Sequence, residues 1–176
     1  MKIRELLPSD HQDIKTLIEE TGLFTDEEIR CALELVSYGL SQHKGEAEYL
    51  FKIATDDSGK LEGYVCYGKT PLTDGVFGIY WVVVCKDSRY HGLGSRLLKE
   101  VEEDIKIKGG RKILIETSSK DNYEKARQFY TKKGYKLIAK IADFYKVGDD
   151  KLIYVKDILL SQVVGVTGNT GQGDPH

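Results

Sequence analysis

The residues from Arg89 to Ser95 have the types and spacing of an anion-binding loop. They follow the apolar run Val82–Val84, have the sequence Arg-Tyr-His-Gly-Leu-Gly-Ser, and precede a helical pattern of apolar residues. The first N–H groups of a helix have no intrahelical partners and lie at the positive end of its dipole, and glycine lets a bulky phosphate approach the backbone. We therefore predict a phosphate site at this turn, where Arg89 either adds a charge-assisted hydrogen bond or remains solvated.

Two familiar nucleotide-binding loops do not fit this segment. A Walker loop requires the pattern G-x-x-x-x-G-K-[ST], which the chain does not contain. The dinucleotide fingerprint G-x-G-x-x-G begins at Gly92 but fails at its third glycine, because Leu97 occupies that position. The loop therefore predicts phosphate binding without either of these signatures.

A strand, a helix and a second strand must position this loop. The segment Val76–Cys85 is almost entirely apolar, which predicts a long buried strand. After the loop, one helical face up to Gly109-Gly110 carries Leu93, Leu97, Leu98, Val101 and Ile105. The run Ile113–Ile115 is typical of a strand covered on both faces, and the strand–helix–strand order predicts that the two strands are parallel.

The whole chain predicts a mixed α and β domain with the element order βααβββαβαββ. The expected elements are strand 2–6, a helix from Ser9-Asp10 to Gly22, a helix opened by the capping box Thr25–Glu28, the hairpin 49–55 with 61–67, strand 76–85, the helix after Gly92, strand 113–115, helix 123–133, and strands 135–145 and 151–160. Residues 1–160 would form one domain. Residues 161–176 contain four glycines and no aromatic residue, which predicts a disordered tail or an edge strand through Val163–Val166.

Composition excludes several classes of function. The chain has 26 Lys and Arg against 28 Asp and Glu, so its formal net charge of −2 does not favour nucleic acid. The apolar run 79–85 is far shorter than the roughly 20 residues of a membrane span. The four histidines of the chain are scattered along the sequence, so we expect no metal site. An odd number of cysteines without C-x-x-C spacing and a charged N-terminal segment favour a cytoplasmic location.

Two motifs resemble the GNAT superfamily of acyl-CoA-dependent N-acetyltransferases. Residues 89–94 have the pattern R-x-x-G-x-G, similar to the family signature R/Q-x-x-G-x-G/A. Residues 126–130 have the pattern A-x-x-x-Y and precede Gly-Tyr at 134–135, where the family places G-[FY]. The resemblance covers residues 1–158. It implies an α/β (α+β) fold with a mixed, mostly antiparallel sheet of about seven strands and four helices on both faces.

The resemblance also implies how acetyl-CoA, the acyl donor, would bind. Its pyrophosphate would lie against the backbone amides of the loop, and its pantetheine arm would pair with the backbone of a valine strand where the fourth and fifth strands splay apart. The family's asparagine, seven residues before the tyrosine, is replaced by Tyr123, which leaves the displaced Asn122 as a candidate. The expected cofactor-binding residues are Val82, Val83, Val84, Arg89, Tyr90, His91, Gly92, Leu93, Gly94, Ser95 and Asn122.

Tyr130 and Glu116 are the catalytic candidates. Tyr130 matches the family's tyrosine acid, and a phenol of pKa about 10 would protonate a departing thiolate whose conjugate acid has a pKa of about 8.5; the alternative is simple packing on the sheet. Glu116 follows a buried strand, where burial would suit a general base. It would otherwise orient the next loop or pair with a lysine, and Asp143, Tyr80 or a water chain would then be the base.

The resemblance therefore implies an N-acetyltransferase that moves an acetyl group directly from acetyl-CoA to a primary amine in a ternary complex. The acceptor would lie near residues 23–41, 69–75 and 144–150, where acidic and aromatic residues would suit a cationic amine or simply be solvated. A small molecule and a protein amine are both compatible, and a homodimer is possible by resemblance. The competing function is a non-catalytic acyl-CoA-binding sensor or assembly module.

Overall fold

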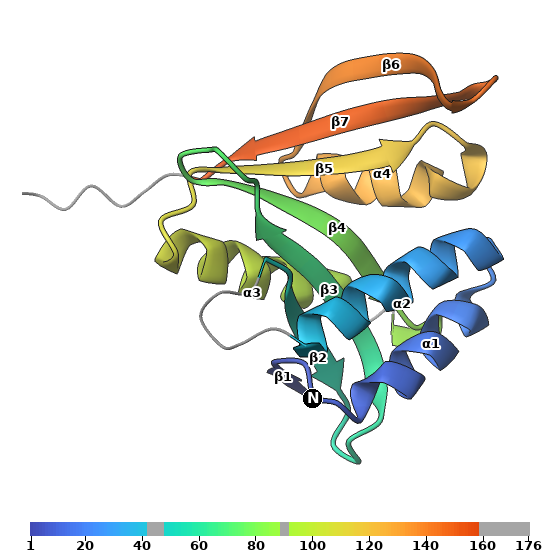
Figure 1. Cartoon of the computed structure of the whole chain (residues 1–176), viewed down its shortest axis with the longest axis vertical. Helices are drawn as coiled ribbons and strands as arrows, with labels where there is room; N and C mark the ends of the chain where they lie inside the picture. The colour runs from blue at the N-terminus through green and yellow to red at the C-terminus, as the bar shows by residue number, and fades with distance from the viewer. Residues whose placement is uncertain (42–47, 89–91, 159–176) are drawn as a thin grey trace, which may run out of the picture.

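The computed structural model describes residues 1–41, 48–88 and 92–158, and within them it has the predicted order of elements (Figure 1). The strands are β1 (Lys2–Arg4), β2 (Leu50–Thr55), β3 (Leu61–Lys69), β4 (Val76–Val84), β5 (Lys112–Ser118), β6 (Lys136–Lys146) and β7 (Asp149–Asp157). The helices are α1 (Asp10–Thr21), α2 (Asp26–Ser41), α3 (Leu93–Ile107) and α4 (Glu124–Lys132), with a short 3-10 helix, η2 (Asp121–Tyr123), before α4. The predicted tail at 161–176 lies outside the described residues.

The seven strands form one sheet in the order β1-β2-β3-β4-β5-β7-β6. Strands β4 and β5 are parallel, and the other neighbouring pairs are antiparallel. This arrangement confirms the predicted fold class and the parallel pair on either side of α3. Strand β7 lies between β5 and β6, so the last strand of the described chain is inside the sheet and β6 forms its edge.

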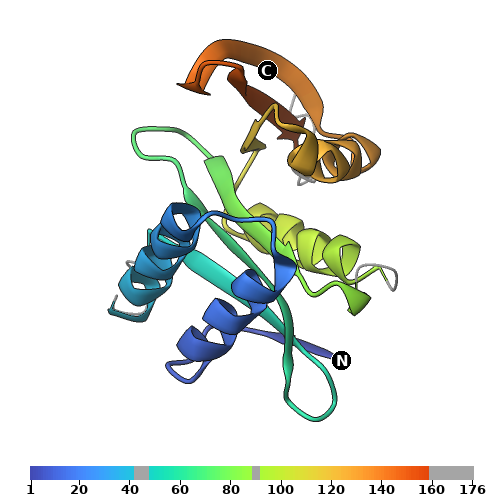
Figure 2. The same cartoon turned by 90° about the vertical axis from the view of Figure 1, so that its right-hand side faces the viewer.

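Two buried clusters show which helices cover which face of the sheet. Side chains of α1 and α2, including Ile14 and Val36, pack on one face around Tyr64. Side chains of α3 and α4 pack on the other face, where all five apolar residues predicted for α3 are at most 1% exposed. Figure 2 shows the first two helices on one side of the sheet and the other two across it. The end of β4 and the start of α3 therefore lie where the sheet meets the second helical layer.

Two buried tyrosines attach α3 to the sheet through hydrogen bonds. The Tyr67 hydroxyl of β3 donates to Asp104 Oδ2 at 2.6 Å, and the Tyr135 hydroxyl donates to Glu102 Oε1 at 3.0 Å. The pKa of both phenols is raised well above the usual value, mainly by burial and to a smaller extent by the neighbouring carboxylate. Both carboxylates project from α3, so these contacts hold the helix that carries the predicted anion site.

We expect stability to fall as the pH rises above about 10, where phenols in the unfolded chain ionise. Burial keeps Tyr67, Tyr130 and Tyr135 protonated in the folded protein to higher pH. Because the folded state then binds more protons than the unfolded state, each group lowers the free energy of unfolding by about 1.4 kcal/mol per pH unit between its two pKa values. Thermal melting from about pH 8 to pH 11, with tyrosinate absorbance recorded in parallel, measures this fall. A melting temperature that stays constant over this range would contradict the prediction.

Within the described parts of the chain, no helix is both long and apolar enough to cross a bilayer.

Candidate cofactor and acceptor site

Strands β4 and β5 separate at the centre of the sheet. Their parallel pairing runs from Val76 opposite Lys112 to Ile79 opposite Ile115 and stops there, although β4 continues to Val84 and β5 to Ser118. Figure 1 shows β4 and β5 diverging along their length. The sheet therefore has the split that the resemblance implied.

A β-bulge in β4 lies where the split begins. Opposite β3, Tyr67 pairs with Ile79 and Cys66 with Trp81, so Tyr80 is an extra residue in its strand. Its ring covers Gly78, where an added Cβ would come within 3.0 Å of the ring. This bulge was not predicted from the sequence, where its signal is a glycine, Gly78, inside an apolar strand.

Helix α3 begins beside the open end of the split. Gly92 is its N-cap, in the left-handed region at φ 74°, and as a glycine it has no side chain to cap the helix. The backbone N–H of Arg96 donates to the Gly92 carbonyl at 3.1 Å, so the N–H groups of the three residues between them have no acceptor inside the helix. These residues are Leu93, Gly94 and Ser95. The other predicted loop residues, Arg89, Tyr90 and His91, lie outside the described residues.

Gly94 is closely surrounded by residues of β4 and α4. A Cβ at Gly94 would lie 3.6 Å from the Phe129 ring and 3.7 Å from Val84 Cγ2. The start of α3, the end of β4 and helix α4 thus meet at one place, next to the split. The three predicted valines lie in the same stretch of β4, with Val83 buried toward α1 and α2 and Val82 and Val84 packed on the α3 side.

Tyr130 is buried in α4 with only 8% of its surface exposed. Its ring lies between the rings of Tyr135 and Tyr154, with centroids at 6.1 and 6.3 Å. Burial raises the pKa of the Tyr130 phenol to about 12. Among the described residues, none accepts a hydrogen bond from its hydroxyl, which distinguishes it from the structural phenol of Tyr135. Tyr130 therefore packs on the sheet and still carries an uncommitted proton.

The expectation that Glu116 is buried is wrong. Its side chain is 48% exposed and forms an ion pair with Lys151 of β7. Strand β5 alternates, so the buried Ile113 and Ile115 face α3 while Glu116 faces the side of α1 and α2. Asp143, a substitute considered for the base, accepts a hydrogen bond from Gly148 N at 2.7 Å and holds the β6–β7 turn.

The segment after β5 is tied to the loop between α1 and α2. Asn122 Nδ2 donates to the Leu23 carbonyl at 3.3 Å, so its amide is engaged on this side of the sheet. The Tyr123 hydroxyl donates to Glu28 Oε1 at 2.6 Å, and burial together with this carboxylate raises the Tyr123 pKa. The other carboxylate oxygen of Glu28 accepts a hydrogen bond from the backbone N–H of Thr25, in the predicted capping box. Glu28 thus joins the starts of α2 and α4, a role its sequence position did not indicate.

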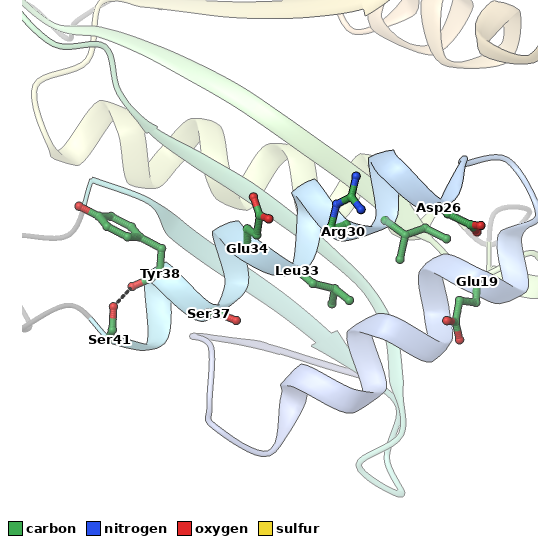
Figure 3. Close-up of a pocket in the computed structure, with 9 residues that line it drawn as sticks. Glu19, Asp26, Arg30, Leu33, Glu34, Ser37, Tyr38 and Ser41 are labelled. Carbon is green, nitrogen blue, oxygen red and sulfur yellow. Dashed lines mark hydrogen bonds between the residues drawn. The ribbon is translucent and has the colours of Figure 1, made fainter.

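A hollow of about 660 Å³ runs along α2, away from the split (Figure 3). Its walls are Glu19 of α1 and a stripe of α2 side chains that ends at Tyr38 and Ser41. None of its lining residues belongs to β4, β5 or the start of α3. It is therefore separate from the place where the cofactor is expected.

Comparison with known proteins agrees with this geometry. The profile of the acetyltransferase (GNAT) domain matches residues 47–137, just over half of the chain. The crystal structure of a GNAT-family protein from Desulfovibrio desulfuricans has 39% sequence identity and a TM-score of 0.83, over 89% of this chain and 98% of that one. The chain belongs to the GNAT acetyltransferase family.

More distant structures share the fold alone. The ribosomal-protein-S18-alanine N-acetyltransferase of Escherichia coli is 16% identical, with a TM-score of 0.70 over 93% of this chain and 97% of that one. An aminoglycoside 6'-N-acetyltransferase complexed with coenzyme A is 19% identical, with a TM-score of 0.69 over 90% of this chain and 98% of that one. No curated protein matches the chain.

Proposed function

We propose that this protein transfers an acetyl group from acetyl-CoA directly to a primary amine within a ternary complex. The observation that carries the proposal is the position of the start of α3, with glycine as its N-cap, next to the split between β4 and β5. The first feature suits a diphosphate and the second suits an extended arm that adds to the edge of a strand. Family membership supports the same donor.

The residues of the chain fit this cosubstrate. The N–H groups of Leu93, Gly94 and Ser95 would donate to phosphate oxygens. Backbone groups of Val82–Val84 would pair with the pantetheine arm while their side chains stay in the core. The family resemblance adds Arg89, Tyr90 and His91, and it leaves Asn122 as a weaker candidate because its amide already binds Leu23.

Acetyl-CoA supplies an activated acetyl group as a thioester. Tyr130 would donate a proton to the leaving sulfur, because its phenol is protonated at neutral pH. Glu116, at the end of the β4–β5 pairing, would accept the proton of the amine, directly or through a water. Its exposure allows an amine to approach from the side of α1 and α2.

Direct transfer is favoured over an acetylated cysteine. Burial raises the pKa of the Cys66 thiol far above neutrality, so this thiol stays protonated. The Cys85 thiol donates to Glu62 Oε2 at 2.7 Å, and Ser88 Oγ donates to the same oxygen at 2.6 Å. The two donors lower the pKa of Glu62, which makes it a weak base for activating Cys85.

Release of free thiol from acetyl-CoA, measured over a panel of primary amines, tests the proposed function. We expect release that depends on the amine and saturates with both substrates. Initial-velocity patterns should indicate a ternary complex, in which both substrates are bound before transfer. Stabilisation by acetyl-CoA without amine-dependent release over the whole panel would instead support a non-catalytic acyl-CoA sensor. Absence of stabilisation by acetyl-CoA would contradict both functions.

A further inference from the structure

Three tyrosines form a continuous row on the side of the sheet that α2 covers. Tyr38 of α2 contacts Tyr49, and Tyr49 contacts Tyr80 of β4, edge to face with ring centroids 5.5 and 5.3 Å apart. Tyr38 and Tyr80 remain 46% and 42% exposed, so both ends of this row are open to a ligand. We call these three side chains the tyrosine row.

The backbone beneath the row is built from two glycines. Gly68 of β3 pairs with Gly78 of β4, and the ring of Tyr80 lies over both, within 3.5 and 3.0 Å of their missing Cβ positions. The Glu48 carbonyl would come within 2.0 Å of a Cβ at Gly68. A larger residue at either glycine would displace the row, so the local sequence holds Tyr80 and Glu48 close to the sheet.

One carboxylate lies at each end of the row. At the outer end, the Tyr38 hydroxyl donates to Glu48 Oε2 at 3.3 Å. At the inner end, Tyr80 follows Ile79, whose partner Ile115 precedes Glu116. Gly78 of β4 pairs with Leu114 of β5, and the Tyr80 ring lies over the missing Cβ of Gly78. Glu116 is two residues after Leu114 in its strand, so Tyr80 and Glu116 lie on the same face. Burial raises the pKa of Tyr80, and the charges of Glu116 and Glu48 add to this shift.

The β6–β7 hairpin provides an aromatic wall on the other side of Glu116. Phe144 and Tyr145 are about half exposed, and the Lys151 ammonium that pairs with Glu116 lies 4.4 Å from the centroid of the Phe144 ring. Burial raises the pKa of Tyr145, and the charge of Glu116 adds to this shift. A protein ammonium therefore already occupies the environment of carboxylate and aromatic ring that favours cationic amines.

We propose that the acceptor is an aliphatic diamine or polyamine, with its reacting amine at Glu116, its carbon chain along the tyrosine row and a second ammonium at Glu48. This inference rests on the proposed function and names its acceptor class. Two carboxylates separated by aromatic rings match two ammonium groups separated by methylenes, because the rings accept both the apolar chain and the positive charge. A monoamine of the same length would lose the contacts at the outer end.

Comparison of 1,6-diaminohexane with hexylamine in the thiol-release assay tests the inference. We expect kcat/KM to be about tenfold higher for the diamine, since one exposed ion pair and one cation–π contact are lost with the monoamine. Glu48→Gln should raise KM for the diamine by about the same factor with little change in kcat. Tyr80→Leu should also reduce the preference, whereas Tyr80→Phe keeps the ring and should retain it.

Glu103→Gln, which removes an exposed carboxylate of α3 on the opposite face of the sheet, is the matched control and should retain the preference for the diamine. Equal kcat/KM for the two amines in the wild-type protein would overturn the inference, as would a preference unaffected by Glu48→Gln. If acetyl-CoA raises the melting temperature but neither amine is acetylated, the inference fails while cofactor binding stands. If acetyl-CoA does not stabilise the protein, the proposed function itself fails.

Discussion

Replacing Tyr130 by phenylalanine is expected to lower kcat for thiol release by roughly 10² to 10⁴-fold, the usual contribution of a positioned general acid. The variant loses one hydroxyl that donates to no described residue, and it keeps the ring contacts with Tyr135 and Tyr154. KM for acetyl-CoA and the melting temperature should therefore change little. Steady-state kinetics with a fixed amine, together with thermal melting, measure both effects.

The pH profile and a neighbouring tyrosine provide the controls for Tyr130. With a phenol pKa of about 12, the acid form persists throughout the neutral and moderately alkaline range, so the wild-type rate should not decline between about pH 8 and pH 10 on account of this group. Tyr135→Phe removes a second buried phenol, whose hydrogen bond to Glu102 is structural. That variant should melt earlier and retain turnover. A Tyr130→Phe variant with wild-type kcat across this pH range would remove Tyr130 from the mechanism.

Gly92→Val is expected to abolish the stabilisation of the protein by acetyl-CoA. In the wild type, ligand at a hundredfold excess over Kd adds about 2.7 kcal/mol, or roughly 5 to 10 °C in melting temperature for a chain of this size. Gly92 has φ 74°, which a β-branched residue rarely adopts, so the turn must change its backbone conformation. Such a change would turn the first N–H groups of α3 away from a bound diphosphate. Thermal melting with and without acetyl-CoA measures the loss.

Gly134→Val is the matched control for backbone strain. Gly134 follows α4 with φ 85°, and an added Cβ at either glycine would meet no atom of the described residues within 4 Å. Both variants should therefore lose about 1 to 2 kcal/mol of stability from the left-handed backbone. The shift caused by acetyl-CoA should disappear only in the Gly92 variant. Its full retention there would show that the start of α3 does not hold the cosubstrate.

Local patterns predicted the elements of this protein well. The helical repeat from Leu93 to Ile105 and the buried run at 113–115 both correspond to elements with the expected buried faces. Gly22 ends α1 in the left-handed conformation, and Thr25 and Glu28 form the capping box of α2. These features depend on residues a few positions apart, so the chain specifies them before any tertiary contact forms.

The candidate site was less predictable because its residues come from distant parts of the chain. Glu116 was expected to be buried because it follows a buried strand, but the alternation of β5 turns it to the face of α1 and α2, where it pairs with Lys151. The bulge at Tyr80 depends on pairing with β3. The link from Tyr123 to Glu28 spans 95 positions, for which no local pattern provides a signal.

Local sequence specifies the order of the elements, the glycine turn before α3 and the family to which the chain is similar, because hydrophobic period and turn chemistry act over short distances. Long-range contacts set which strands are neighbours, where their pairing ends and which face Glu116 and Tyr80 share. Those properties follow from long-range packing of the sheet against two helical layers. The same packing brings Glu48, the tyrosine row and Glu116 together beside the split, where the acceptor is proposed to bind.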